Sequence, residues 1–96
     1  MYFYTQWNPR EPEISRFLGI VIYMYFNEHN PPHFHAEYNE YKASMLIDSL
    51  GLMEGKLPSK VMSLVVEWAQ EHQDELRDNW NSMKTTGGYH KIQPLV

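Results

Sequence analysis

Apolar and polar residues alternate along two neighbouring segments, His33 to Tyr38 and Tyr41 to Asp48. This alternation is typical of β-strands with one buried face, and the intervening Asn39-Glu40 pair has the length of a tight hairpin turn. A two-residue turn places Tyr38 opposite Tyr41 and thereby determines the pairing of the residues behind them. One face of the predicted hairpin is apolar. The other is mostly polar and comprises His33, His35, Glu37, Lys42, Ser44, Leu46 and Asp48.

The chain before this hairpin predicts a strand and a loop. Arg16 to Phe26 is rich in β-branched and aromatic residues, which favours a single central strand, and Gly19 within it indicates a bulge or a close backbone approach. Asn27 to Pro32 is dense in turn-forming residues, so we expect a loop there. Residues 1–13 show no periodicity and are interpreted as an extended lead-in to one domain spanning residues 14–96.

Apolar residues recur at helical spacing from Val61 to Met83, following Pro58. The apolar stripe keeps its phase throughout, so we expect one long helix or two collinear helices with a break near Gln73. Gly87-Gly88 ends this region, and residues 89–96 form a tail that we expect to pair or dock. The predicted fold is therefore α+β, a small antiparallel β-meander of three to four strands packed against a long C-terminal helix.

Composition and charge narrow the class of protein. A chain of 96 residues suits one domain, and the absence of cysteine excludes disulfides, thiolate nucleophiles and Cys-based zinc sites. A net charge of −4 with scattered basic residues argues against a protein that coats nucleic acid, although an enzyme with a small local RNA site is compatible with it. Without an apolar run of spanning length or a signal-peptide pattern, we expect a cytoplasmic protein with no membrane partner. The many aromatic rings are compatible with a partner interface or a homo-oligomer.

The spacing of His33 and His35 is compatible with a metal site. Residues i and i+2 on a strand point to the same side with Cα atoms about 6.5–7 Å apart, and imidazole is a common ligand for zinc and nickel. Glu37 shares the face but lies about 13 Å from His33 along the strand, too far to share one ion easily. We therefore expect the third ligand to be His29, with Asp48 or His90 as alternatives. In the opposing, structural interpretation, the histidines hydrogen-bond to Ser44 and the preceding loop.

The same histidines also suit acid–base chemistry without a metal. A neutral imidazole accepts a proton from a ribose 2′-OH while a protonated one donates to the leaving oxygen, and both forms are populated near neutral pH. A cation near the phosphate is normally required, and Lys42, Arg16 or Lys91 are the candidates. The candidate catalytic residues are therefore His33, His35 and Lys42. His72 lies on the apolar helix stripe and is interpreted as structural.

Several stretches of the chain form a distinctive set: residues 13–17, residues 19–38 with the His29–His35 run at their centre, residues 54–58, and the Glu67-Trp68 and Asn79-Trp80 pairs. Together they resemble a family of small bacterial proteins catalogued as domain of unknown function 4160. The resemblance covers residues 12–95. It implies one half of a two-gene, toxin–antitoxin-like module with a small cognate partner protein, and it implies functional roles for His29, His33 and His35, with Glu37 and Lys42 beside them.

Three hypotheses of function follow from these patterns. The leading one is a component of a two-protein toxin–antitoxin-like module, with RNA cleavage by paired histidines if the protein is an enzyme. The second is a non-catalytic protein-binding module in which aromatic rings and the acidic helix face dock a partner and the histidines are structural. The third is a metal-binding domain that uses His33 and His35 with one further ligand.

Overall fold

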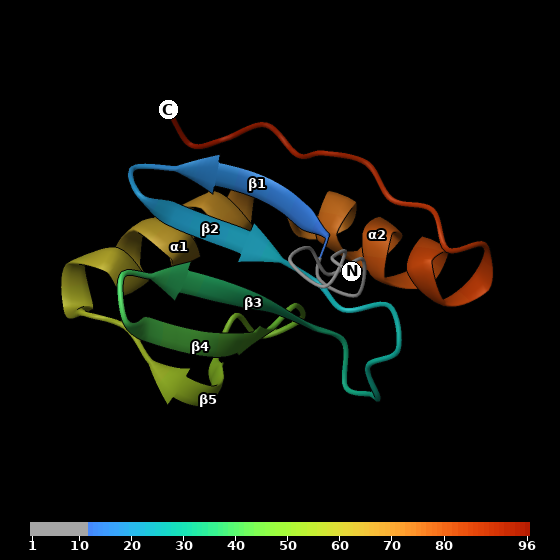
Figure 1. The fold of residues 1–96 in the computed structure, drawn as a ribbon, viewed down its shortest axis with the longest axis horizontal. Coiled ribbons are helices and arrows are strands. Elements are labelled where there is room, and N and C mark those ends of the chain that lie inside the picture. The colour runs from blue at the N-terminus through green and yellow to red at the C-terminus, as the bar shows by residue number, and fades with distance from the viewer. Residues whose placement is uncertain (1–11) are drawn as a thin grey trace, which may run out of the picture.

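In the computed structural model, which describes residues 12–96, five antiparallel strands form one sheet in the order β1-β2-β3-β4-β5. Two helices cover one face of this sheet (Figure 1). The strands are β1 Glu13–Phe17, β2 Ile20–Tyr23, β3 His33–Tyr38, β4 Tyr41–Leu46 and β5 Leu52–Lys56, and the helices are α1 Ser59–Glu71 and α2 Gln73–Thr85. The α+β meander is as predicted, with five strands instead of three to four. The predicted lead-in, residues 1–13, lies outside the described residues except for its last two positions.

The central hairpin has the predicted register. Tyr38 pairs with Tyr41, and the pairing continues regularly to His33 opposite Leu46. Asn39 occupies the turn with φ 53°, a conformation that Asn tolerates better than most residues. On the apolar face the residues at the centre of both strands are buried under the helices: Phe34, Ala36, Ala43 and Met45. The polar face is turned away from the helices except at His33, which Trp80 of α2 covers, and it is called the open face below.

The prediction of one strand from Arg16 to Phe26 is wrong. Phe17 pairs with Ile20, so Leu18 and Gly19 form a two-residue turn between β1 and β2. Both turn residues have positive φ, 52° and 80°, as a type I′ hairpin requires. Gly19 therefore supplies a turn and not a bulge. Leucine seldom adopts this conformation, and the apolar run hides the turn from an analysis of hydrophobicity.

The helical region divides in two. Helix α1 ends at Glu71 and α2 begins at Gln73, with His72 between them at φ −127°, so the predicted break near Gln73 is confirmed. The predicted apolar stripe continues through both helices and supplies the buried residues Val61, Val65, Trp68, Leu76, Trp80 and Met83. Within residues 12–96, neither helix is long and apolar enough to cross a membrane.

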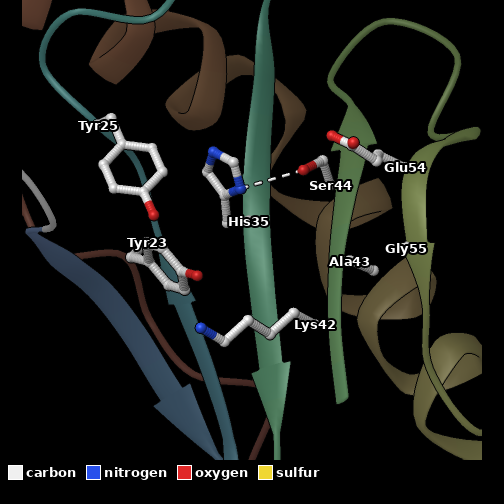
Figure 2. Close-up of a pocket in the computed structure, with 8 residues that line it drawn as sticks. All are labelled: Tyr23, Tyr25, His35, Lys42, Ala43, Ser44, Glu54 and Gly55. Carbon is white, nitrogen blue, oxygen red and sulfur yellow. Dashed lines mark hydrogen bonds between the residues drawn. The ribbon is translucent and has the colours of Figure 1, made fainter. Parts of the chain in front are cut away.

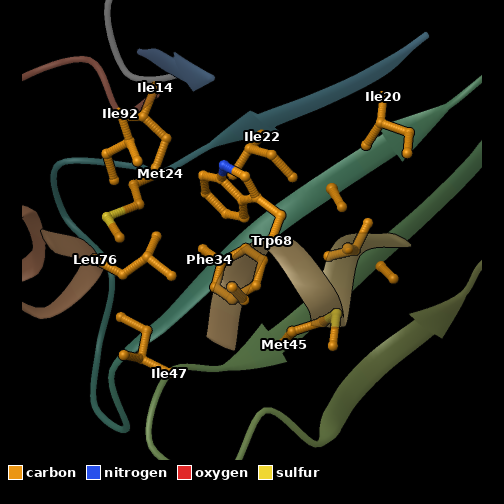
Figure 3. Close-up of a cluster of buried hydrophobic side chains, with 14 of the residues drawn as sticks. Ile14, Ile20, Ile22, Met24, Phe34, Met45, Ile47, Trp68, Leu76 and Ile92 are labelled. Atoms are coloured by element: carbon orange, nitrogen blue, oxygen red, sulfur yellow. The ribbon is translucent and has the colours of Figure 1, made fainter. Parts of the chain in front are cut away.

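Trp68 is the centre of the core, and Figure 3 shows it among side chains from the sheet, both helices and the tail. Its ring centroid lies 5.6 Å from that of Phe17 and 6.1 Å from that of Phe34. Its indole N–H donates to the carbonyl oxygen of Gln93 at 2.8 Å, and the Ile92 amide donates to the carbonyl of Ile14 at 2.8 Å. The C-terminal tail thus docks along β1, as the analysis of the sequence expected (Figure 1).

Candidate metal centre

Three side chains converge where β3 begins. His33 and His35 project from the open face, and Glu28 reaches them from the loop between β2 and β3. Glu28 Oε1 lies 3.0 Å from His33 Nε2 and makes a second, short hydrogen bond with His35 Nε2. These three potential ligand atoms all lie within 4.8 Å of one another. We call Glu28, His33 and His35 the His–Glu centre.

Hydrogen bonds on the far side of each ring orient the two imidazoles. His33 Nδ1 lies 2.8 Å from the carbonyl oxygen of Pro31, which only accepts, so Nδ1 carries a proton and donates. His35 Nδ1 lies 3.1 Å from Ser44 Oγ, and the same direction of donation is available there. In the neutral tautomer this leaves both Nε2 lone pairs directed at the Glu28 carboxylate. Histidines that bind metals are typically held in this way by a partner on the other nitrogen.

The electrostatics of the centre favour a cation. Burial raises the pKa of Glu28, but the hydrogen bonds and charges of His35 and His33 outweigh it, so the pKa lies below its usual value. An ionised carboxylate facing two neutral imidazole lone pairs repels them, and either protons or a metal ion must relieve that repulsion. For a tetrahedral ion with ligands at about 2.1 Å, ligand atoms are roughly 3.4 Å apart. The 3.0 Å separation between Glu28 and His33 is within a small adjustment of that value.

Aromatic rings surround both histidines. Tyr23 stacks on His35 with centroids 5.2 Å apart, and Tyr25 meets the same ring edge-on at 4.6 Å, as the neighbouring side chains in Figure 2 show. His33 packs against Trp80 of α2 at 5.3 Å. The side chains of His33 and His35 are consequently only 5 % and 15 % exposed. Packing on this scale restricts the rings to one orientation, which suits preorganised ligands.

Helix α2 also holds the loop that carries Glu28. The ammonium of Lys84 donates to the backbone carbonyl of Glu28 at 2.6 Å and lies 4.9 Å from the centre of the Trp80 ring. Trp80 and Lys84 are four residues apart, so they occupy one face of α2. This face therefore contacts His33 through Trp80 and the loop through Lys84.

The expected third ligands lie elsewhere. His29 is exposed in the loop and does not belong to the group of converging ligand atoms. Asp48 forms an ion pair with Arg77 at 2.9 Å, and His90 lies 3.8 Å from Glu75 on α2. The residue that completes the group is Glu28, which the analysis of the sequence did not identify. Its one sequence signal is its place in the Asn- and Pro-rich loop directly before the two histidines.

Glu37 and Lys42 lie together on the open face, as the hairpin register predicted. The Lys42 ammonium is 3.6 Å from the Glu37 carboxylate, and Glu37 also accepts a hydrogen bond from the Tyr23 hydroxyl at 3.2 Å. Burial and the Glu37 charge raise the pKa of Tyr23, so its phenol stays protonated and donates. Glu37 is thus occupied away from the His–Glu centre.

The candidate cations for acid–base chemistry are separated. Lys42 lines a pocket together with His35, whereas Arg16 lies on β1 and pairs with Glu13 at 2.8 Å. His33, the second candidate catalytic histidine, is nearly inaccessible in this arrangement because Trp80 and Glu28 cover its ring. The hydrogen bonds expected by the structural interpretation, from His35 to Ser44 and from the histidines to the preceding loop, are also present.

Comparisons with known proteins identify a family but no activity. No curated protein and no solved structure matches the chain. One family model does match, over residues 19–81, and this range includes all three residues of the His–Glu centre as well as Trp80. Because the match spans more than half of the 96 residues, the chain belongs to the family described as domain of unknown function DUF4160.

Proposed function

We propose that the protein binds one divalent transition-metal ion, such as zinc or nickel, through Glu28, His33 and His35. The observation that carries this proposal is the convergence of two imidazole Nε2 atoms on one carboxylate oxygen. Both opposite ring nitrogens are occupied by Pro31 and Ser44, which favours the tautomers that coordinate metals. A set of two histidines and one carboxylate suits zinc, nickel or iron better than magnesium or calcium.

Among residues 12–96 the set has three ligands, and this number supports a catalytic role for the ion. Structural zinc sites are usually closed by four protein ligands, whereas three ligands leave one position for water or substrate. A zinc-bound water has a pKa of about 7 and is a hydroxide nucleophile at neutral pH. We therefore propose hydrolysis by an ion-bound water as the class of reaction.

Metal binding is measured by isothermal titration calorimetry of the ion-free protein with Zn²⁺ and Ni²⁺. We expect one site per chain, and at least about 100-fold weaker binding in Glu28→Gln and His35→Ala, since even residues behind the ligands contribute 10–100-fold. His29→Ala is the matched control, because His29 is an exposed histidine next to Glu28 in the same loop. Equal losses in His29→Ala and His35→Ala, or no binding to the wild type, contradict the proposal.

A second candidate is metal-independent RNA cleavage by His33 and His35 with Lys42, in which case the chain is the toxin-like half of a two-protein module. The observation that favours it is that His35 and Lys42 line one pocket. The burial of His33 weighs against it, because a general acid or base must reach the substrate. Incubation of a folded RNA with the wild type separates the candidates: cleavage that survives a chelator supports the second, and cleavage restored only by added metal supports the first.

A further inference from the structure

A pocket of about 260 Å³ opens on the open face beside His35. Its walls come from β2, β3, β4 and β5, and its floor includes the hydroxyl of Ser44 (Figure 2). The ammonium of Lys42 lies near Tyr23 at one end of this pocket, and the carboxylate of Glu54 lies beside Ser44 at the other end. The ring of His35 separates the pocket from the His–Glu centre, because Nδ1 faces Ser44 and Nε2 faces Glu28.

Lys42 and Glu54 are placed to pair with each other but do not. Lys42 lies opposite Lys56, and Ser44 lies opposite Glu54, so Lys42 and Glu54 are diagonal neighbours on one face of the sheet. Diagonal neighbours are about 7–8 Å apart, within reach of long side chains. Instead, Lys42 turns to Glu37 at 3.6 Å, with 72 % of its side chain exposed, and Glu54 forms no ion pair with any residue in 12–96. Both side chains line the same pocket, and the contact of Lys42 with Glu37 is an exposed one.

Ser44 adds a buried hydrogen-bond donor to this hollow. The residue is 7 % exposed, and among the described residues its hydroxyl has one hydrogen-bond partner, His35 Nδ1. When His35 Nδ1–H donates, Ser44 Oγ is the acceptor and its own hydrogen needs an acceptor in turn. Buried donors without an acceptor are costly, so an oxygen atom of a ligand fits there.

We propose that this pocket binds a small zwitterion that carries one carboxylate and one ammonium group. The carboxylate accepts hydrogen bonds from Lys42 and Ser44, and the ammonium pairs with Glu54. A simple anion fits less well because Glu54 repels it, and a simple cation fits less well because Lys42 repels it. Amino acids and short peptides carry this pair of charges at their two ends. The inference goes beyond metal binding, because neither Lys42 nor Glu54 is a ligand of the proposed ion.

Calorimetry or chemical-shift perturbation of the ion-free protein with glycylglycine tests the proposal. We expect saturable binding that weakens at least about tenfold in Lys42→Met and in Glu54→Gln, because each variant loses one hydrogen bond between charged groups. Lys56→Met is the matched control, since Lys56 lies opposite Lys42 but does not line this pocket. A parallel titration with glycine distinguishes the two kinds of ligand. If glycine binds as tightly as glycylglycine, the ligand is a free amino acid; if glycine binds more weakly, it is a short peptide.

Several outcomes overturn the proposal. Acetate or ethylammonium binding as tightly as glycylglycine shows that one charge suffices, and tighter binding in Glu54→Gln shows that the pocket is an anion site. Absence of saturable binding by the wild type also overturns it. Because the protein is ion-free, these results leave the metal proposal untouched, and a zinc titration of Lys42→Met that matches the wild type confirms that the variant is folded.

Discussion

Replacement of Lys84 by methionine separates two opposite effects of this residue on metal binding. Lys84 donates to the Glu28 carbonyl at 2.6 Å and lies over Trp80 at 4.9 Å, so it holds the loop in the position that Glu28 needs as a ligand. Its positive charge, however, repels an incoming metal ion. Loss of the holding contact weakens metal binding, whereas loss of the charge alone strengthens it. The sign of the change therefore reports which effect dominates.

The structure indicates that the holding contact has the larger effect on metal affinity. A hydrogen bond from a charged donor contributes about 1.5–3 kcal/mol, and Lys84 is exposed, so the lower end of that range applies. An exposed cation–π contact adds about 0.5–1 kcal/mol. Repulsion between solvated charges is weakened by water and salt. Since about 1.4 kcal/mol corresponds to a tenfold change in affinity, Lys84→Met is expected to weaken Zn²⁺ binding by about tenfold or somewhat more.

The assay is competition for Zn²⁺ with a chromophoric chelator at fixed ionic strength. Lys84→Arg keeps the charge and a donor and is expected to recover most of the affinity. Lys60→Met removes an exposed lysine from α1, far along the chain from the ligand loop, and is expected to leave the affinity unchanged. Unchanged or tighter binding in Lys84→Met refutes the reasoning, as does an equal loss in Lys60→Met.

Three further predictions concern stability. Leu18→Asn should raise the melting temperature in thermal unfolding followed by circular dichroism. Leu18 is 55 % exposed and has φ 52°, a conformation that costs leucine about 1–2 kcal/mol and that asparagine adopts more readily. A lower melting temperature contradicts this. Gly55→Ala should lower the free energy of unfolding in urea by at least about 2 kcal/mol, because Gly55 has φ 79° and a Cβ there would lie 2.2 Å from the Lys42 carbonyl oxygen. A loss under about 0.5 kcal/mol argues against that geometry. The depressed pKa of Glu28 means that its stabilising contribution is present above its unfolded value near 4.5 and is lost as the pH falls below it. The ion-free wild type should therefore lose more stability than Glu28→Gln between pH 6 and about pH 3, and parallel pH profiles exclude this contribution.

The β3–β4 hairpin was predictable residue by residue because two independent signals agree there. Period-two alternation assigns the faces, and the Asn39-Glu40 pair sets the register. At Leu18-Gly19 neither signal is clear: every residue of β2, directly after the turn, is apolar, and leucine is a poor turn residue. The extra hairpin therefore becomes visible only through the pairing of Phe17 with Ile20. Tertiary packing of β1 against the C-terminal tail, and not local preference, stabilises it.

The candidate centre was predictable in part for a similar reason. A strand imposes a fixed direction on its side chains, so His33 and His35 could be placed on one face from their spacing alone. A loop imposes no such period, and the backbone between Asn27 and Pro32 can bring Glu28 or His29 towards the histidines with equal plausibility. The choice of Glu28 depends on Lys84, which is 56 residues away and holds the Glu28 carbonyl. No pattern local to the loop contains that contact.

The break at His72 connects the fold to the candidate centre. Helix α1 packs its buried residues, Trp68 above all, against the middle of the sheet, while α2 brings Trp80 and Lys84 to the end where β3 begins. His33 belongs by its alternation to the polar face, yet it is 4 % exposed because Trp80 covers it there. Its Nδ1 is hydrogen-bonded to a carbonyl and its Nε2 to a carboxylate. His33 has therefore lost most of its access to substrate, but it can still coordinate a metal ion. That combination favours an ion over a pair of acid–base histidines at this position.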